Sequence, residues 1–369
     1  MSIRSRWEFC VQHCEEVAEN FIREFFSDNN RTVFLITAAG FDPRSCEIPD
    51  RLLAAGHERI HGLVLREERL EGLELMPLAD EHASKLTGSS DNFVVERVPL
   101  FADDGAVVGG RHVATLLSQR DLAQYTDIVV DFSALSIGIA FPAVRYLLEA
   151  IDSGAAATLP NLHIAVIDEP WTDSEIQSIA SNKAAPIHGF SGVSGIDRAQ
   201  DSARLWMPQL GRGQDLHAVL ELIHQAVRPH AVCPILPFPS TDIRFTDELI
   251  WRFRTELENT WRVDDRDVVF AHENQPLDLY RSVLRIHEVR ERVFCDVGGS
   301  MTVLSPTGRK MLAIGAMLAA IEKDFPVMHV ESVGYSVDLD RLNAARDGKK
   351  GRLAHLWIAG EAYLGSREA

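Results

Sequence analysis

Short runs rich in valine and isoleucine alternate with amphipathic segments along most of this chain of 369 residues. Three of the runs are RTVFLITAAG from residue 31, DIVVDFSAL from residue 127 and LHIAVIDEP from residue 162, and a helical pattern accompanies each of them. Strands that alternate with helices are typical of a parallel sheet with helices on both faces. The sequence therefore predicts an α/β fold with mainly parallel sheets.

The same order of strands and helices occurs a second time in the chain. AVCPILPFPSTDIR at 231–244 corresponds to VFLITAAGFDPR at 33–44, and SMTVLSPTGRKMLAIG at 300–315 corresponds to DIVVDFSALSIGIAFP at 127–142. We expect two tandem Rossmann-like units related by an internal pseudo-duplication. Two generic α/β units that share only the order of the fold would give the same pattern.

The predicted domain organisation has four parts. Large apolar residues and cysteines at helical spacing predict a helix near the N-terminus, and a stretch rich in serine, glycine and aspartate separates the two repeats. The parts are an N-terminal helix in 1–30, a first Rossmann-like unit in 31–170, a connecting segment in 171–215 and a second unit in 216–369.

Charge and composition exclude several classes of function. A formal net charge of -17 argues against binding to duplex nucleic acid, which needs many lysine and arginine contacts to phosphate, although a few local cations can still hold a small anion. The apolar runs are too short to span a bilayer and the N-terminus has no signal-peptide pattern, so we expect a cytoplasmic protein that does not bind a membrane. The five cysteines show neither C-x-x-C pairs nor zinc-ligand spacing, and we expect them to be reduced and no metal to be bound.

Familiar catalytic motifs do not occur in the sequence. We find no G-x-G-x-x-G after the first predicted strand, no P-loop, no H-E-x-x-H and no G-x-S-x-G. The sequence therefore predicts no cofactor and identifies no catalytic residue. Whether the protein is an enzyme stays open.

The segment SPTGRK, residues 305–310, has the strongest features of a ligand site. Ligands of open parallel sheets bind at the carboxyl ends of strands, where helix N-termini present backbone N–H groups. Gly308 allows a close approach of the backbone, Ser305 and Thr307 supply hydroxyl groups, and Arg309 and Lys310 supply charge. Unless an anion is bound, each of the two cations interacts unfavourably with the helix dipole and destabilises the helix by about 0.3–1 kcal/mol. We predict an anion site here, and the alternative is that both cations reach into water or toward surface carboxylates.

Other strand-end residues are secondary candidates. The loop of the first repeat that corresponds to SPTGRK has hydroxyl groups and no cation, which favours the second repeat as the main site. Aspartates in the two corresponding turns are expected to cap them, and the arginines two residues later are expected to contact a ligand or to form an interdomain salt bridge. Two further polar residues end a strand and either read a base or sugar edge or are ordinary turn residues. The loop hydroxyls are those of Ser133 and Ser136, the turn-capping aspartates are Asp42 and Asp242, the arginines are Arg44 and Arg244, and the strand-end residues are Glu273 and Asn274.

Residues 295–323, CDVGGSMTVLSPTGRKMLAIGAMLAAIEK, resemble the signature region of CARF domains, the Rossmann-like sensors of CRISPR ancillary effectors. In that family a strand is followed by a Gly-Thr-Lys-x-Met type of loop and an apolar helix, whereas here Thr307 precedes Gly308 and Lys310 adjoins Met311. Two fused CARF-like units form the SAVED domain of bacterial antiphage systems, which resembles the duplication described above. The resemblance implies that a cyclic oligonucleotide binds across the strand ends. The implied contacts are Ser305, Thr307, Gly308, Arg309 and Lys310, together with Ser240, Thr241 and Arg244.

We therefore expect a sensor for an anionic nucleotide or cyclic oligonucleotide second messenger in a bacterial defence system. The resemblance also implies a homo-oligomer, with a separate effector protein as a possible partner. Two alternatives stay open. One is an enzyme acting on a nucleotide or sugar phosphate, with Ser305 or Asp242 near the chemistry, and the other is an interaction scaffold in a multi-protein complex.

Overall fold

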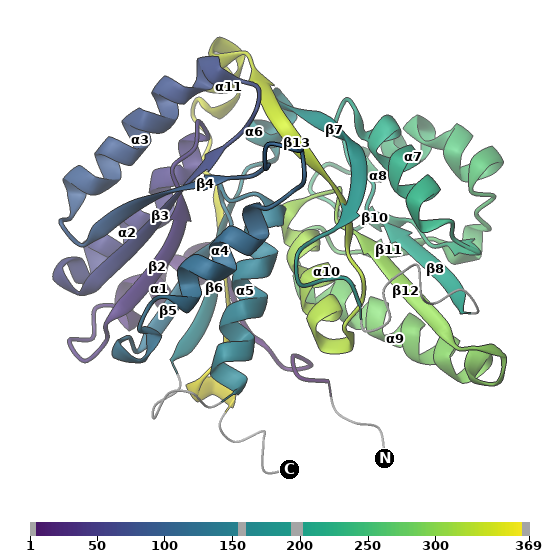
Figure 1. Ribbon diagram of the computed structural model, residues 1–369, viewed down its shortest axis with the longest axis horizontal. Coiled ribbons are helices and arrows are strands. Elements are labelled where there is room, and N and C mark those ends of the chain that lie inside the picture. Colours follow the sequence, from purple (N-terminus) through teal and green to yellow (C-terminus); the bar gives the residue numbers. More distant parts are fainter. Residues whose placement is uncertain (1–4, 154–159, 193–201, 364–369) are drawn as a thin grey trace. The chain divides into compact units, whose positions relative to one another are not determined.

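The computed structural model describes residues 5–153, 160–192 and 202–363, and it divides into two compact units (Figure 1). We call residues 9–176 with 334–369 the first-sheet unit, and residues 1–8 with 177–333 the second-sheet unit. The chain passes from one unit to the other after Glu8, Ile176 and Val333. Each unit is described by itself.

The first-sheet unit is built on a seven-stranded sheet in the order β1-β14-β6-β5-β2-β3-β4. Five neighbouring strands, from β6 to β4, run parallel, while β14 and β1 are added antiparallel at one edge. Every residue of β2, β5 and β6 is buried, as expected for parallel strands covered on both faces. The predicted α/β fold with a mainly parallel sheet is confirmed here. The strands are β1 (Val11–Cys14), β2 (Val33–Ala38), β3 (Ile60–Glu68), β4 (Phe93–Pro99), β5 (Asp127–Asp131), β6 (Asn161–Asp168) and β14 (Arg352–Ala359).

Helices cover both faces of this sheet. Residues of α1, α2 and α3 share one buried apolar cluster with alternate residues of the strands, such as Val33 and Leu35 of β2. Helices α4 and α5 pack against each other on the opposite face (Figure 1). The helices of this unit are α1 (Glu15–Phe25), α2 (Glu47–Gly56), α3 (Met76–Ser89), α4 (Gly109–Ser118), α5 (Ile137–Asp152), α6 (Pro170–Glu175) and α11 (Leu339–Arg346).

The second-sheet unit contains shorter parallel strands. The order β12-β8-β9 forms one three-stranded sheet, and β10 pairs with β11. Parallel bridges from Gln209 to Ile235 and from Leu304 to Val327 connect these pieces, so the strands follow one another as β11, β10, β8, β12 and the start of β13. The strands are β8 (Ala203–Pro208), β9 (Ala231–Val232), β10 (Ile235–Pro237), β11 (Val269–Ala271) and β12 (Ser300–Ser305), and a separate pair is β7 (Ile176–Pro186) with β13 (Met328–Val337).

Among the described residues of this unit, four α-helices accompany these strands. Helices α7 and α8 share an apolar cluster with β8 and β12, whereas α9 packs against α10. All residues of α10 from Met311 to Ala320 are buried, as expected for a helix that is apolar on every side. The helices are α7 (Leu216–Val227), α8 (Phe245–Arg252), α9 (Pro276–Phe294) and α10 (Lys310–Lys323).

The prediction of a helix throughout the N-terminal region is wrong for residues 11–14. They form β1, which pairs antiparallel with β14, and the helix begins only at Glu15. Glu15 has a φ of 53°, a left-handed conformation that interrupts a right-handed helix. Cys10 and Cys14 therefore do not lie four residues apart on one helix face.

Two of the predicted boundaries also differ from the structure. The predicted connecting segment 171–215 contains α6, β7 and β8, and residues 334–369 belong to the first-sheet unit because β14 pairs with β6. The sequence comparison placed β10 opposite β2. In the sheets, however, β8 takes the position beside β12 that β2 takes beside β5.

No helix in the described parts of the chain is long and apolar enough to cross a membrane.

Candidate functional site

The carboxyl ends of β10, β11 and β12 bring four of the predicted site residues together in the second-sheet unit. Ser240 and Thr241 follow β10, Glu273 follows β11, and Arg309 follows β12. Because parallel strands end at the same edge of a sheet, their loops converge there. We call these four residues the Glu273 cluster.

Glu273 is the centre of the cluster and is completely buried. Its Oε2 atom accepts hydrogen bonds from the Ser240 hydroxyl at 2.6 Å and from Arg309 Nη1 at 2.8 Å. Its Oε1 atom accepts from the Thr241 backbone N–H at 2.7 Å and from the Thr241 hydroxyl. Burial alone raises the pKa of Glu273, but the hydroxyl donors and the Arg309 charge outweigh it and hold the pKa below its usual value. The residue is therefore a carboxylate at neutral pH.

Arg309 stands at the N-cap of α10, and its side chain is 12% exposed. Its guanidinium faces the Glu273 carboxylate and lies 6.0 Å from the centre of the Phe245 ring. The alternative of a cation that reaches a surface carboxylate does not describe Arg309, because its partner is buried. Lys310 is the first residue of α10 and is half-buried.

Ser305, Thr307 and Gly308 shape the loop between β12 and α10. The Ser305 hydroxyl accepts a hydrogen bond from Trp206 Nε1 at 2.9 Å, and the Thr307 hydroxyl donates to the Gln209 carbonyl at 2.6 Å. A Cβ atom at Gly308 would lie 3.1 Å from the Leu210 carbonyl oxygen, so glycine allows this loop to approach the end of β8. The two hydroxyl groups thus bond to the protein itself.

Gln209 is a functional candidate that the sequence did not reveal. It follows β8 directly and is completely buried, yet within the described residues neither polar atom of its carboxamide has a hydrogen-bond partner. Its Oε1 atom lies 3.4 Å from the place where a Cβ atom of Gly308 would stand, so the carboxamide faces the loop that precedes α10. A buried amide without a partner costs about 1–3 kcal/mol. A strand prediction at residues 203–208 is the signal that would have located Gln209 at a strand end.

Arg212 and Asp242 form the exposed rim of the site. Arg212 Nη2 donates to Asp242 Oδ2 at 2.8 Å and to Glu248 Oε2, and its guanidinium lies 4.4 Å from the centre of the Phe245 ring. The hydrogen bond from Arg212 lowers the pKa of Asp242. Asp242 Oδ1 also accepts a hydrogen bond from the Arg244 backbone N–H at 3.1 Å, and this contact is the turn-capping role expected for Asp242. The Arg244 residue itself is exposed.

Asn274 is half-buried beside Glu273 in the chain. Its backbone N–H donates to His272 Nδ1 at 3.2 Å. Its Oδ1 atom is buried and has no hydrogen-bond partner among the residues that the structure describes. The structure therefore leaves a ligand contact by this amide open.

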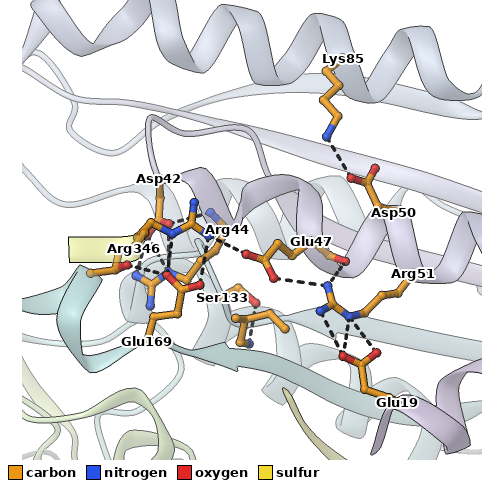
Figure 2. A network of polar contacts seen from close by, with 12 residues as sticks. Glu19, Asp42, Arg44, Glu47, Asp50, Arg51, Lys85, Ser133, Glu169 and Arg346 are labelled. Atoms are coloured by element: carbon orange, nitrogen blue, oxygen red, sulfur yellow. Dashed lines mark hydrogen bonds and ion pairs between the residues drawn. The ribbon is translucent and has the colours of Figure 1, made fainter. Parts of the chain in front are cut away.

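Asp42 and Arg44 are tied into ion pairs of the first-sheet unit, as Figure 2 shows. The Asp42 carboxylate accepts from the Arg44 backbone N–H at 3.0 Å, which caps the turn, and from Arg44 Nη2 at 2.7 Å. Arg44 Nη2 also contacts Asp173 at 2.8 Å, and its side chain is 2% exposed. Nearby, Arg346 bridges Glu169 and Glu47 (Figure 2). The charge of Arg44 is thus balanced by carboxylates of its own unit.

Ser133 and Ser136 are likewise engaged within the first-sheet unit. The Ser133 hydroxyl accepts from the Ile167 backbone N–H at 2.9 Å (Figure 2), and the Ser133 N–H donates to Asp131 at 2.8 Å. The Ser136 N–H, at the start of α5, donates to Glu67 Oε1 at 2.9 Å. A carboxylate of the chain itself therefore lies at the N-terminus of α5.

No group of three or more histidine, cysteine, aspartate or glutamate residues in the described ranges is placed to hold a metal ion.

Comparisons with known proteins identify no family for this chain. No family model matches it, and no curated protein matches it. A solved structure that is similar to it is the cytoplasmic domain of a prokaryotic cation chloride cotransporter, at 10% sequence identity. The match covers 85% of this chain and 99% of that chain with a TM-score of 0.23.

Proposed function

We propose that the second-sheet unit binds a small anionic ligand of the nucleotide class at the Glu273 cluster. The observation that carries the proposal is a buried, unpaired carboxamide, that of Gln209, next to the loop that positions Arg309 at the N-terminus of α10. Glu273 balances the charge of Arg309, so the attraction for an anion comes from Lys310 and from the N-terminus of α10 beside this pair, and an unpaired buried amide gains a hydrogen bond from a ligand.

The environment of Arg309 supports this proposal. The buried Glu273 fixes the direction of the guanidinium, which lowers the entropy cost of binding a ligand there. Lys310 adds a second positive charge in the same helical turn.

The strand orders support the proposed pair of Rossmann-like units. When β9 and β10 are taken as one strand and β1, β14 and β7 are left aside, the strand orders β4-β3-β2-β5-β6 and β11-β10-β8-β12-β13 are the same along the chain. This order is the one found in nucleotide-binding Rossmann folds, whose ligands lie where the strand order reverses. In the first-sheet unit the N-terminus of the helix that corresponds to α10 is bonded to Glu67, so we assign the ligand to the second-sheet unit.

The resemblance of residues 295–323 to CARF and SAVED domains supplies the biological part of the proposal. By that resemblance the protein is a cytoplasmic, homo-oligomeric sensor of a cyclic oligonucleotide in a bacterial antiphage system, and it acts with a separate effector protein. Ser305 is an unfavourable choice for a catalytic group, because its hydroxyl is buried and bonded to Trp206. We therefore favour sensing over turnover.

A ligand panel tests the proposal directly. Melting temperature and calorimetry would be measured with inorganic phosphate, nucleoside mono-, di- and triphosphates, cyclic dinucleotides and cyclic oligoadenylates. A ligand at 100 times its Kd stabilises the folded state by about 2.7 kcal/mol, which is readily detected as a rise in Tm.

The variant Arg309→Ala should weaken the binding of the active ligand by about 10- to 100-fold, since a hydrogen bond to a charged group contributes about 1.5–3 kcal/mol. Arg266→Ala is the matched control, because Arg266 is an exposed arginine of the same unit that pairs locally with Asp264. A panel without any stabilising anion, or equal affinities of Arg309→Ala and the control, would show that the cluster does not bind such a ligand.

A further inference from the structure

Three histidines and an aspartate form a continuous hydrogen-bonded row across four strands of the first-sheet unit. His163 of β6 contacts Asp127 Oδ1 of β5 through Nε2 at 3.2 Å. The Nδ1 atom of His163 lies 2.9 Å from Nε2 of His355 on β14, and Nδ1 of His355 lies 3.1 Å from Nδ1 of His13 on β1. The row thus begins at a buried carboxylate and ends on β1, the edge strand of the sheet.

The contacts assign one proton to each neutral imidazole. His163 donates from Nε2 to the Asp127 carboxylate, so its Nδ1 accepts from Nε2–H of His355. His355 then accepts at Nδ1 from Nδ1–H of His13. Every facing pair has one donor and one acceptor in this arrangement, and the row is satisfied without any positive charge.

The surroundings oppose a positive charge on the row. His163 and His355 are buried, and helix α1 places the Phe21 ring against His13 and His355, with centroid distances of 4.4 Å to each. The charged groups that face the row are Asp127 on β5, Arg31 before β2 and Glu361 after β14.

The pKa values of the three imidazoles reflect this environment. Burial lowers the pKa of His163 despite the opposing effect of Asp127. Burial and the neighbouring imidazoles lower the pKa of His355 far below its usual value and that of His13 to a smaller extent. All three rings are therefore harder to protonate in the folded unit than in water.

We propose that the imidazole row is an acid-sensitive latch that holds β1 on the edge of the seven-stranded sheet and releases it when the pH falls. His13 and His355 are direct partners in the β1–β14 ladder, so release of β1 separates these two rings and admits water to His355. The open form then binds protons that the latched form excludes. Only residues 9 and 10 separate β1 from residues 5–8, which belong to the other compact unit, so the latch acts close to a point where the chain passes between units.

The direction of the pH effect follows from proton linkage. Because the imidazole pKa values are lowered in the latched form, the latch is fully stable above the ordinary histidine value of about 6.5 and weakens as the pH falls below it. Each additional proton bound by the open form raises the opening constant about tenfold per pH unit. Between pH 6.5 and pH 5.5 a ring that titrates near 6.5 in the open form contributes an increase of about fivefold, so release of His13 and His355 together gives about 5- to 30-fold.

Hydrogen exchange of the full chain measures this opening. Exchange rates of the Val11–Cys14 amides, divided by their intrinsic rates, would be compared at pH 7.5, 6.5 and 5.5, with the amides of β2 and β3 as internal references. We expect β1 to lose protection between pH 6.5 and 5.5 while β2 and β3 keep it. Constant protection of β1, or a parallel loss in all three strands, would overturn the latch.

A variant and a spectroscopic measurement complete the test. His13→Asn keeps a donor toward His355 but does not titrate, so the pH dependence should fall by about one proton, whereas His112→Asn on α4 should leave it unchanged. Nitrogen NMR of the wild-type rings should show His163 and His355 as neutral imidazoles protonated at Nε2 at pH 7.5. An unchanged slope in His13→Asn, or the opposite ring protonation, would contradict the proposal.

Discussion

The substitution Glu273→Gln removes the negative charge that Arg309, Ser240 and Thr241 face in the second-sheet unit. Glutamine has the same shape, so the substitution tests the charge rather than the packing. The glutamine side chain ends in one oxygen and one NH₂ group. The NH₂ group faces a hydrogen-bond donor at a position where the Glu273 carboxylate accepted a hydrogen bond.

The size of the effect follows from the contacts. A hydrogen bond to a charged partner contributes about 1.5–3 kcal/mol, against about 0.5–1.5 kcal/mol for a neutral pair. Loss of one partner of a fully buried ion pair costs about 3–5 kcal/mol, and this cost is smaller here because the Arg309 side chain is 12% exposed and can turn toward water. We expect Glu273→Gln to lower the free energy of unfolding by about 2–4 kcal/mol at pH 7.

Denaturation in urea, followed by tryptophan fluorescence to which Trp206 and Trp261 of the same unit contribute, measures this change. The variant Arg309→Met, alone and combined with Glu273→Gln, separates the ion pair from the hydroxyl contacts through a double-mutant cycle. Glu258→Gln is the control, because Glu258 forms an exposed pair with Arg254 whose loss costs at most about 1 kcal/mol.

The pH dependence gives an independent check. The pKa of Glu273 is lowered in the folded state, so its stabilisation is present above the ordinary glutamate value of about 4.3 and is lost as the pH falls below it. The difference in stability between wild type and Glu273→Gln should therefore begin to shrink as the pH falls below about 4.3, and it should vanish only below the lowered pKa of Glu273 in the folded state. A difference under about 0.5 kcal/mol at pH 7, or a coupling to Arg309 near zero, would refute the described geometry.

Two further predictions concern packing and the unpaired amide. Gly315→Ala should lower the free energy of unfolding in urea by about 2 kcal/mol or more, since its Cβ would lie 2.2 Å from the Pro276 carbonyl oxygen. In α3, by contrast, a Cβ at Gly88 would have nothing within 4 Å, so Gly88→Ala should raise the free energy of unfolding by about 0.5–1 kcal/mol. Gln209→Met should raise the stability of the ligand-free protein by about 1–2 kcal/mol and weaken the binding of the anionic ligand in calorimetry. A loss of stability in Gln209→Met would show that the carboxamide is hydrogen-bonded after all.

The parallel sheet was predictable because its central strands carry a direct signal. The strands β2, β5 and β6 are apolar runs bounded by polar turns, and such runs fit only the middle of a sheet covered on both faces. The strand β1 was not predictable in this way. Its residues match a helical spacing, and only the pairing of Val11–Cys14 with β14, more than 300 positions later, makes them a strand.

The strand β8 was missed for a different reason, and the error shifted the comparison of the two repeats. Its sequence ARLWMP follows a stretch rich in serine, glycine and aspartate and resembles a loop segment. With β8 unrecognised, β10 took its place in the comparison, and the residues after β8 were not considered as site residues. Gln209 is the most important of these.

The site itself was predictable as a set of loops but not as a set of contacts. Ser240, Thr241, Glu273 and Arg309 were all candidates, because strand ends in a parallel sheet share an edge. The direction in which each hydroxyl group points depends on the rotamer of its side chain, and the spacing of residues in the sequence does not reveal that rotamer. Ser305 therefore looks equivalent to Ser240 in the sequence, although it donates nothing to the cluster and bonds instead to Trp206.

The helices α5 and α10 begin with opposite local charge. In the first-sheet unit, Glu67 accepts a hydrogen bond from the backbone at the start of α5, so the chain's own carboxylate meets the positive end of the helix dipole. In the second-sheet unit, the carboxylate of Glu273 is bonded instead to the side chain of Arg309, which stands at the N-cap of α10. Because Arg309 and not a carboxylate stands at the N-cap of α10, the side chain at the start of this helix is positive. The protein's own carboxylate thus balances Arg309, and in the proposed function the anionic ligand meets Lys310 and the N-terminus of α10 beside this ion pair.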